Sequence, residues 1–449
     1  MTAPPPLSFH GALRLLAACA LAAMANAAHA GLVVMHGYAD VTSALVWIQA
    51  SAPGPITVAW RPEGDERERR IELAATAERE SIVVARLTGL APGGSARYSV
   101  EGGGERREGV VRAQAHFEDA KAAPPVTIAI GSCYFLNDEN GMRPRDRDYG
   151  GEEHIFDAIA DKRPDVMLWL GDNVYLRRQE YHDTAAMAAR YRAQRAAPPL
   201  RRLLTATSHL AIWDDHDFGP NDADGSFTLK GETLRLFRLY WANPGYGLPE
   251  TPGIFGVASA ADVDFVLLDG RYHRTHPRLP DGPDKTMFGA AQLAWLRSAL
   301  LNARGSVKLV ANGSQFWNAA SRFEGLHQFP GEQKALHDFL LAQRIPGLLF
   351  LSGDRHFTEL LRIDRPGAYP LHEFTSSPLT SRAWEKPEAR ERDNPQVVPG
   401  TLVGRRQFGL IRVTGPGDDR RIALESYDAK GALLWRHELR ARDLAFPAR

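Results

Sequence analysis

Apolar runs that each end in a polar or glycine-containing cluster are the feature that most limits the fold of this chain. They occur beyond residue 125, where amphipathic helical patterns alternate with them. The runs are TIAIGSC (127–133), DVMLWLGD (165–172), LAIWDDHD (210–217), VDFVLLDG (263–270), VKLVANGS (307–314) and GLLFLSGD (347–354). The helical patterns include EEHIFDAIADKR (152–163), AAQLAWLRSALLNA (290–303) and EQKALHDFLLAQR (332–344). Buried strands that alternate with helices predict a layered α/β domain over 126–449.

A different pattern occupies residues 31–118, where no helical period is found. Short alternating or β-branched runs are separated by Gly, Pro and charged turns, which is typical of a small β-sandwich. The runs are SALVWIQAS (43–51), ITVAWRP (56–62), SIVVARL (81–87) and ARYSV (96–100). Residues 119–125, with two prolines at their end, indicate a linker between the two predicted domains.

The first 30 residues have the order of an export signal. Arg14 precedes the run LLAACALAAMANAA, and Ala28-His29-Ala30 predicts cleavage before Gly31. A lipoprotein is the alternative, because Cys19 follows a Leu-Ala-Ala box, although little apolar sequence precedes it. We therefore expect a periplasmic or secreted protein, and no later run is long enough to span a membrane.

Charge and cysteine content narrow the classes of function. The 449 residues carry a formal net charge of zero, which argues against nonspecific binding of nucleic acid and leaves room for a site that binds one small anion. Only Cys19 and Cys133 are present, so a processed chain would hold a single thiol. A lone thiol in an oxidising compartment is expected to be buried, reactive or a metal ligand.

The polar clusters at the strand ends contain the side chains that bind metals. They contribute Cys133, Asp172 with Tyr175, the Asp214–Asp217 segment with Asn221, and Asp354 with His356. Thiolate, phenolate and imidazole suit a transition metal such as iron, whereas carboxylate and amide oxygens suit Ca²⁺, Mg²⁺ or Mn²⁺. In open α/β sheets ligands gather at the carboxyl ends of the strands. The sequence therefore predicts a centre that holds two kinds of metal, although each residue taken singly also has a structural explanation.

The series GSC, GDxxY, WDDHD…PND and GDxH resembles the motifs of PhoD-like alkaline phosphatases, within the metallophosphoesterase superfamily. The β-rich segment before it is similar to the fibronectin III-like or Ig-like domain that precedes the catalytic domain in that family. The resemblance implies a four-layer α/β/β/α sandwich that holds Fe³⁺ and Ca²⁺. It also implies hydrolysis of phosphate monoesters by in-line attack of a metal-bound hydroxide.

The same resemblance implies a role for each motif residue. Cys133, Tyr175 and His356 would hold Fe³⁺, Asp172 would bridge the metals, and Asn221 with Asp354 would hold the second cation, for which Mg²⁺ or Mn²⁺ could replace Ca²⁺. The third motif departs from the family, because Pro220 stands where other members often have a first asparagine. Asp215 is therefore the alternative ligand, and it is grouped with His216 as a candidate catalytic residue.

Alternative functions remain open at this point. A phosphodiesterase or phospholipase D-like hydrolase would use the same site, and a secreted binding module could carry an inactive catalytic domain. No P-loop, dinucleotide fingerprint or GxSxG elbow is present, which argues against nucleoside triphosphatases, Rossmann enzymes and serine hydrolases.

Three further segments flank the predicted centre. Arg271 and Arg274 suit phosphate, but a structural role on a buried carboxylate such as Asp269 is favoured. Gln315 and Trp317 are expected to pack near the cleft. The charged and proline-rich segment 382–403 is a candidate lid.

Overall fold

The computed structural model describes residues 31–118, 122–137, 148–417 and 419–447. The predicted export signal with Cys19 and part of the predicted linker lie outside the described residues. Within the described part of the chain, no helix has the length and apolar character needed to cross a membrane.

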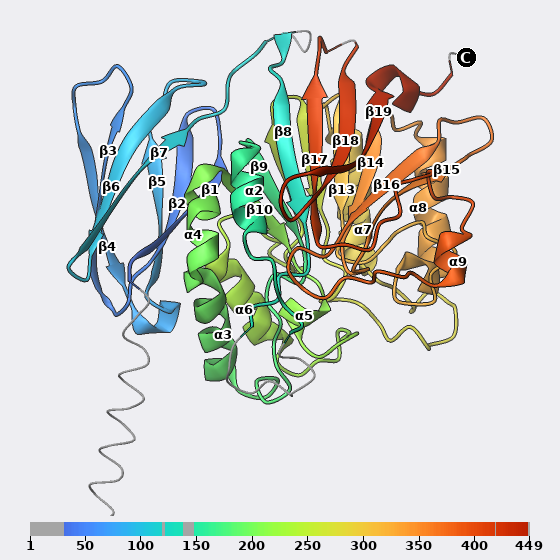
Figure 1. Ribbon diagram of the computed structural model, residues 1–449, viewed down its shortest axis with the longest axis horizontal. Helices are drawn as coiled ribbons and strands as arrows, with labels where there is room; N and C mark the ends of the chain where they lie inside the picture. Colours follow the sequence, from blue (N-terminus) through green and yellow to red (C-terminus); the bar gives the residue numbers. More distant parts are fainter. Residues whose placement is uncertain (1–30, 119–121, 138–147, 418, 448–449) are drawn as a thin grey trace, which may run out of the picture.

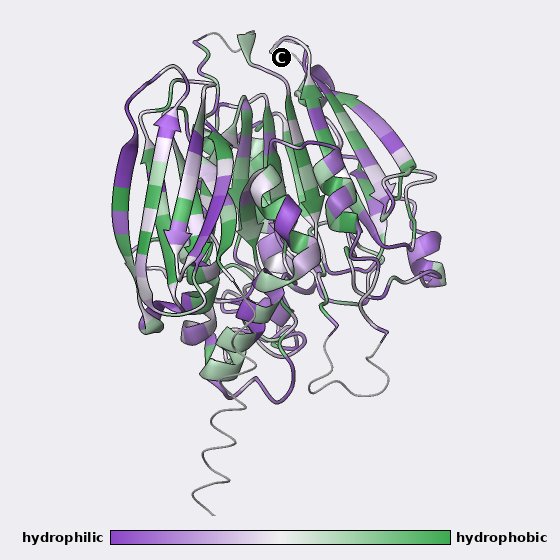
Figure 2. Cartoon of the chain, turned by 60° about the vertical axis from the view of Figure 1, so that its left-hand side comes forward, coloured by the Kyte–Doolittle hydropathy of each residue, from purple (hydrophilic) through white to green (hydrophobic). Residues whose placement is uncertain are grey.

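Seven antiparallel strands form a β-sandwich at the start of the described chain (Figure 1). They are β1 (Val33–Ala39), β2 (Ser43–Gln49), β3 (Gly54–Pro62), β4 (Arg69–Ala75), β5 (Ile82–Thr88), β6 (Ser95–Gly102) and β7 (Glu105–Arg112). One sheet has the order β1-β2-β5 and the other β4-β3-β6-β7. Hydrophobic and hydrophilic residues alternate along these strands, as the bands of colour in Figure 2 show, because one face of each strand points into the sandwich core.

Strands β1 and β2 of the first sheet are buried on both faces. Val46 on β2 packs inside the sandwich, whereas its neighbour Trp47 belongs to the main hydrophobic core of the molecule. The indole Nε1 of Trp47 donates to Leu239 O at 2.8 Å, and Gln49 donates to the Tyr240 hydroxyl at 3.0 Å. This double burial explains why all seven residues of β2 are buried.

Two mixed six-stranded sheets form the larger domain. The first has the order β10-β9-β8-β17-β18-β19, and the second β11-β12-β13-β14-β16-β15. The strands are β8 (Val126–Gly131), β9 (Val166–Leu170), β10 (Ser208–Ile212), β11 (Gly256–Ala260), β12 (Val263–Leu267), β13 (Val307–Ala311), β14 (Leu348–Ser352), β15 (Thr358–Ile363), β16 (Leu371–Ser376), β17 (Gln407–Thr414), β18 (Arg421–Asp428) and β19 (Leu433–Arg440). Strands β8, β9 and β10 are parallel, as are β12, β13, β14 and β16. Strand β17 pairs antiparallel with both β8 and β18.

Helices flank these sheets on the outside. The α-helices are α2 (Ile155–Asp161), α3 (Thr184–Ala196), α4 (Arg201–Ala206), α5 (Asp215–Phe218), α6 (Lys230–Tyr240), α7 (Ala290–Asn302), α8 (Pro330–Ala342) and α9 (Ala389–Arg392). Short 3-10 turns are η1 (Ala77–Arg79), η4 (Pro198–Leu200), η5 (Leu326–Gln328) and η6 (Ala441–Leu444). Helices α2 and α4 lie beside the first sheet, and α7 and α8 beside the second (Figure 1).

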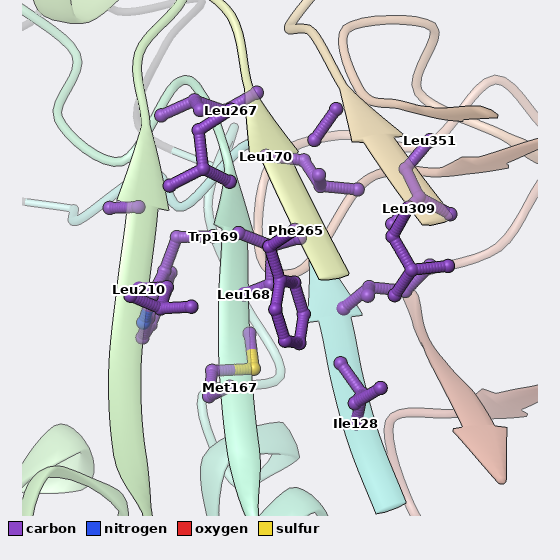
Figure 3. Close-up of a cluster of buried hydrophobic side chains, with 14 of the residues drawn as sticks. Ile128, Met167, Leu168, Trp169, Leu170, Leu210, Phe265, Leu267, Leu309 and Leu351 are labelled. Atoms are coloured by element: carbon purple, nitrogen blue, oxygen red, sulfur yellow. The ribbon is translucent and has the colours of Figure 1, made fainter. Parts of the chain in front are cut away.

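The two sheets face each other across one apolar core. Leu168 and Leu210 of the first sheet lie in the same cluster as Phe265 and Leu309 of the second (Figure 3). Near-continuous apolar runs are required here because the strands are covered on both faces. The predicted fold class, an α/β/β/α sandwich preceded by a small all-β sandwich, is confirmed.

Candidate metal centre

The predicted ligands reach one edge of the two sheets because each follows the carboxyl end of a strand. Cys133 comes two residues after β8, Asp172 two residues after β9, and Asp354 two residues after β14. Strands β8 and β9 are parallel neighbours, and the Cys133 backbone N–H donates to Gly171 O at 3.2 Å. The turns after these strands lie near α5, at the lower edge of the sheets in Figure 1.

Glycines allow these turns to approach each other closely. A Cβ added at Gly353 would lie 2.6 Å from the Cβ of Ser132, so only glycine lets the end of β14 contact the end of β8. Gly171 has a φ of +94°, and a Cβ there would lie 2.7 Å from the Cβ of Asp214. Both Gly-Asp motifs therefore carry glycine for packing and backbone reasons, while the aspartate that follows is free to serve the site.

The residues at the strand ends share an uncommon backbone conformation. Cys133, Asp172, Asp354 and His356 have φ values of 62°, 52°, 62° and 55°, in the left-handed region that non-glycine residues rarely adopt. Such strain persists only where the surrounding structure fixes it, and it concentrates at functional sites. The turns are therefore shaped to aim these side chains rather than to minimise backbone energy.

Four of the predicted ligands come together and form what we call the thiol cluster: Cys133, Asp172, Tyr175 and His356. The Tyr175 hydroxyl lies 3.1 Å from Asp172 Oδ2 and 3.3 Å from His356 Nε2, and Cys133 Sγ lies 3.5 Å from the same Oδ2. One ligand atom each from the cysteine, the aspartate and the histidine lie within 4.8 Å of one another. The first three residues are buried, so the cluster is largely shielded from solvent.

A backbone carbonyl fixes the tautomer of His356. Its Nδ1 lies 2.6 Å from Arg382 O, and because a carbonyl only accepts, Nδ1 must carry the proton. The lone pair is then on Nε2, which faces the Tyr175 hydroxyl and lies 3.3 Å from the Ser381 hydroxyl. This arrangement is the one by which histidines that bind metals are usually oriented.

A second set of residues, which we call the carboxylate cluster, lies beside the thiol cluster. Ligand oxygens of Asp214, Glu324 and Asp354 lie within 4.8 Å of one another, as do those of Asp215, Asp222 and Glu324. Asp172 connects the two clusters, because its Oδ2 faces the thiol cluster while its Oδ1 accepts from the backbone N–H of His216 at 3.2 Å. A carboxylate in this position can serve two cations at once.

Arg271 and Arg274 compensate part of this negative charge. Arg271 donates from Nε to Asp214 at 2.6 Å and forms a bidentate pair with Glu324, and Arg274 Nη2 lies 2.9 Å from the same glutamate. Both arginines are buried. The structural role favoured by the sequence is thus present, but the partners are Asp214 and Glu324. Asp269 accepts instead from the Arg271 backbone N–H at 3.0 Å.

Asn221 differs from the other predicted ligands, because its side chain is exposed on the turn after Pro220. The side chain of its neighbour Asp222 belongs to the carboxylate cluster. Sequence reasoning missed Asp222 and Glu324, and also Ser377, whose hydroxyl donates to Cys133 Sγ at 3.1 Å. The position of Asp222 directly after Asn221 is the one signal in the sequence for that residue, and Glu324 does not directly follow a strand.

Burial disfavours the charged forms of the residues in the thiol cluster when no cation is present. Burial and the nearby Asp172 raise the pKa of the Cys133 thiol well above its usual value, and burial with the same carboxyl does so for the Tyr175 phenol. Burial, then Asp215, raises the pKa of Asp172 as well. Burial lowers the pKa of His356 to about 4, so the imidazole is neutral at pH 7.

This donor set fits the metals that the resemblance implies. Four potential ligands converge with no cationic side chain among them, and buried polar atoms of this kind are normally satisfied by a partner. In the carboxylate cluster, Asp214 Oδ2 is buried with no hydrogen-bond partner among the described residues. A cation at either cluster would supply the missing interactions and favour the deprotonated ligands.

Comparison with known proteins agrees with this geometry. Residues 258–413 match the family model described as PhoD-like phosphatase. That part of the chain is similar to PhoD-like phosphatases. The solved structure of PhoD is 17% identical, with a TM-score of 0.71 and 91% of each chain covered. Purple acid phosphatase PPD1 from yellow lupin (Lupinus luteus) seeds is 10% identical, with a TM-score of 0.68 and coverage of 93% of this chain and 77% of that one. Comparison with curated proteins found no match.

The PhoD-like region includes Asp354 and His356, whereas Cys133, Asp172 and Tyr175 lie before it. The two solved structures extend the likeness over most of the chain as a shared fold. The resemblance to PhoD-like phosphatases is confirmed for residues 258–413.

Proposed function

We propose that the protein is an exported metal-dependent phosphatase of the alkaline phosphatase D type that hydrolyses phosphate monoesters. The coarser statement, a PhoD-like metal-dependent phosphatase, follows from the family match and the metallophosphoesterase fold. The observation that carries the proposal is the convergence of Cys133, Asp172, Tyr175 and His356 at the strand ends of this fold. The periplasmic or secreted location rests on the sequence of the first 30 residues.

The residues divide between two cations. Cys133, Tyr175 and His356 would hold Fe³⁺, because thiolate, phenolate and imidazole suit iron, and Asp172 would bridge. Asp354, with Asn221 from the motif, would hold the second cation through oxygen atoms, as Ca²⁺, Mg²⁺ and Mn²⁺ all prefer. Such cations neutralise phosphate oxygens and lower the pKa of a coordinated water.

His216 and Asp215 are the proposed catalytic residues of this chain. The His216 ring packs 4.3 Å from the Tyr175 ring, and its Nδ1 is buried without a hydrogen-bond partner among the described residues. Asp215 Oδ1 accepts from the His216 backbone N–H at 2.9 Å and thereby fixes the start of α5. His216 can therefore hold a proton and donate it to the departing alkoxide.

The first test measures metal content together with hydrolysis. Protein isolated from its export compartment is expected to contain stoichiometric iron and a second metal, and to hydrolyse monoesters faster than diesters. Cys133→Ser should lose iron, because a hydroxyl is a poorer iron ligand than a thiolate. Protein without metal, or iron unchanged in Cys133→Ser, would contradict the proposal, and faster hydrolysis of diesters would assign it to phosphodiesters.

A matched pair of tyrosine variants sharpens the test. A phenolate bound to Fe³⁺ absorbs visible light, so Tyr175→Phe should abolish that band. Tyr134→Phe is the control, because Tyr134 is also buried and its hydroxyl has no hydrogen-bond partner among the described residues. The control should keep both the band and the iron, and folding of each variant is verified by circular dichroism.

A further inference from the structure

Ser377 lies beside the thiol cluster without belonging to it. It directly follows β16, and its side chain is fully buried. Its hydroxyl donates to Cys133 Sγ at 3.1 Å and accepts from the backbone N–H of His356 at 2.9 Å. One hydroxyl therefore contacts two of the proposed iron ligands, the sulfur of the first and the backbone of the second.

The direction of these two hydrogen bonds follows from the chemistry of their partners. A backbone N–H only donates, so the Ser377 oxygen accepts from His356. The hydroxyl proton is then directed at the sulfur, which is the only acceptor in contact with it among the described residues. A deprotonated Cys133 can only accept, so with the thiolate this contact is a charge-assisted hydrogen bond.

A second hydroxyl near the sulfur is differently placed. Ser132 Oγ lies 3.4 Å from Cys133 Sγ, but it also donates to the Ser376 carbonyl oxygen at 3.0 Å. A hydroxyl carries one proton, so Ser132 divides it between two acceptors, whereas Ser377 directs it at one. Ser377 is therefore the main hydroxyl donor to the sulfur in the described part of the chain.

The backbone around Ser377 is held in place from two sides. Gln407, the first residue of β17, donates from Nε2 to Ser377 O at 3.2 Å, and its backbone N–H donates to Pro378 O at 2.8 Å. On the other side, the Leu379 N–H donates to Ser132 O at 2.8 Å. These contacts involve no metal ligand side chain, so they hold the Ser377 hydroxyl at the sulfur independently of a bound metal.

Hydrogen bonds to a thiolate ligand change the properties of the metal that it binds. Such a bond withdraws electron density from the sulfur, and in iron–sulfur and copper–thiolate sites it is one of the features that set the reduction potential. Partners outside the ligand set also orient the ligands, and their loss typically lowers metal affinity or activity by about 10- to 100-fold. Ser377 is placed to have both effects on an iron held by Cys133.

We propose that Ser377 is a positioning residue for the iron site: its hydroxyl orients the Cys133 thiolate and weakens the donation of electrons from sulfur to the metal. Ferric iron at this site is then a stronger Lewis acid, and is reduced more easily, than it would be beside a thiolate without a hydrogen-bond donor. The inference rests on the proposed function, because it assumes that iron binds at the thiol cluster.

The test compares the iron-loaded protein with Ser377→Ala. The variant keeps the thiolate and loses its hydrogen bond, so the charge-transfer band from sulfur to iron should move to longer wavelength and the reduction potential should become more negative. Iron affinity, measured by competition with a chelator, should fall by about 10- to 100-fold. Ser376→Ala is the matched control, because the Ser376 hydroxyl is equally buried and donates to Ile130 O at 3.2 Å without contacting the sulfur. The control should keep the band, the potential and the affinity of the parent.

A second measurement needs no change in the sequence. Resonance Raman spectroscopy in heavy water should shift the iron–sulfur stretching band of the parent, because the hydroxyl proton on the sulfur is exchanged for deuterium. Ser132→Ala should retain this shift and Ser377→Ala should lose it. A band that does not shift in the parent would overturn the inference even where Ser377→Ala fails to fold, and a shift that only Ser132→Ala removes would assign the role to Ser132.

These spectroscopic measurements separate the inference from the proposed function, because they do not depend on turnover. A band and a potential that stay unchanged in Ser377→Ala would overturn the inference and leave the proposed phosphatase intact. The expected shifts in a protein that hydrolyses no phosphate monoester would overturn the proposed function and leave the role of Ser377 established. A protein that binds no iron would overturn both.

Discussion

His216 lies in α5, beside the proposed iron ligands. Its ring rests on Tyr175, and Nδ1 is buried without a hydrogen-bond partner among the described residues. Burial lowers the pKa of His216, and the Asp215 carboxylate opposes this shift. The net shift is downward, so a protonated His216 would be a stronger acid than an ordinary imidazolium and would release its proton readily to a departing alkoxide.

We expect His216→Ala to slow the hydrolysis of esters with poor leaving groups more than that of esters with good ones. A loss of about 10²–10⁴ in kcat/KM is expected for alkyl phosphates, because their alkoxide needs a proton as it departs. Nitrophenyl phosphate should be affected far less. The measurement is kcat/KM across a series of leaving groups, and an equal loss throughout would show that His216 only positions other residues.

At this scale the sequence predicted the residues that follow regular strand ends. Cys133, Asp172 and His356 could be grouped because the carboxyl ends of parallel strands meet at one edge. Glu324 could not, since it comes from an irregular segment between β13 and α8 whose path depends on tertiary packing. Asn221 illustrates the converse, because a motif gives the residue type but not how exposed the turn leaves it.

The segment 382–403 is held in place by many contacts, unlike a mobile lid. Val403 bridges to Thr358 and Val397 to Leu361, and Trp384 N donates to His356 O at 2.8 Å. The segment therefore supports the strained turn that carries Asp354 and His356. Its charge and proline content predicted a surface loop, but composition could not reveal these backbone pairings.

Helix α9 in this segment contributes a buried ion pair. Glu391 accepts from Arg355 Nη2 at 2.8 Å, and their side chains are 1% and 3% exposed. The Arg355 guanidinium also lies 4.4 Å from the centre of the Phe323 ring. Because Arg355 stands between Asp354 and His356, this pair fixes the turn from behind.

We expect Glu391→Ala to lower the free energy of unfolding by about 3–5 kcal/mol, because the buried Arg355 charge then keeps only its longer contact of 3.9 Å with Asp354. The variant should also release its metals at lower chelator concentration. Urea unfolding at fixed metal concentration measures the first effect and a chelator titration the second.

Glu438→Ala is the matched control for this change. Glu438 pairs with Arg436 at 2.5 Å, but both side chains are at least half exposed. Removing it should change the free energy of unfolding by less than about 1 kcal/mol. A similar loss in both variants would contradict a supporting role for α9.

Several histidines in the interior of the molecule are neutral at pH 7. Burial lowers the pKa of His36 and His372 to about 4 and that of His209 to about 3. For His209 the reason is visible, because Trp169 Nε1 donates to its Nδ1 at 2.9 Å. A proton on Nδ1 would place two N–H groups against each other.

Because of these histidines, the free energy of unfolding depends on pH. The unfolded chain binds a proton on each histidine near pH 6.5, whereas folded His209 does so only near its lowered pKa of about 3. Its contribution is therefore fully present above pH 6.5 and lost as the pH falls. Between pH 6.5 and 4 we expect a loss of about 3 kcal/mol from this residue.

The variant His209→Gln isolates this effect from other titrating groups. Glutamine can accept from Trp169 and donate to Leu203 O, which His209 Nε2 contacts at 3.1 Å, but it does not titrate. Urea unfolding from pH 7 to 4 should give a shallower decline for the variant than for the parent. The exposed His154→Gln should follow the parent, and identical slopes in all three would exclude the buried histidine as a cause.

At the scale of the molecule, periodicity predicted the fold class, an α/β sandwich preceded by a small all-β sandwich. It could not predict that β1 and β2 would be buried on both faces, because alternation shows which residues share a face but not what covers it. Trp47 contributes to the main core although its segment belongs to the sandwich.

The position of β17 has a consequence for the order in which the protein is made. This strand supplies the hydrogen-bonded neighbour of β8, whose end carries Cys133, yet it begins only at Gln407. A nascent chain that stops short of it would contain every proposed ligand and still lack one of the two strands that flank β8. Metal would then be loaded only after synthesis is nearly complete, so the compartment in which the chain finishes folding would determine which ions it acquires.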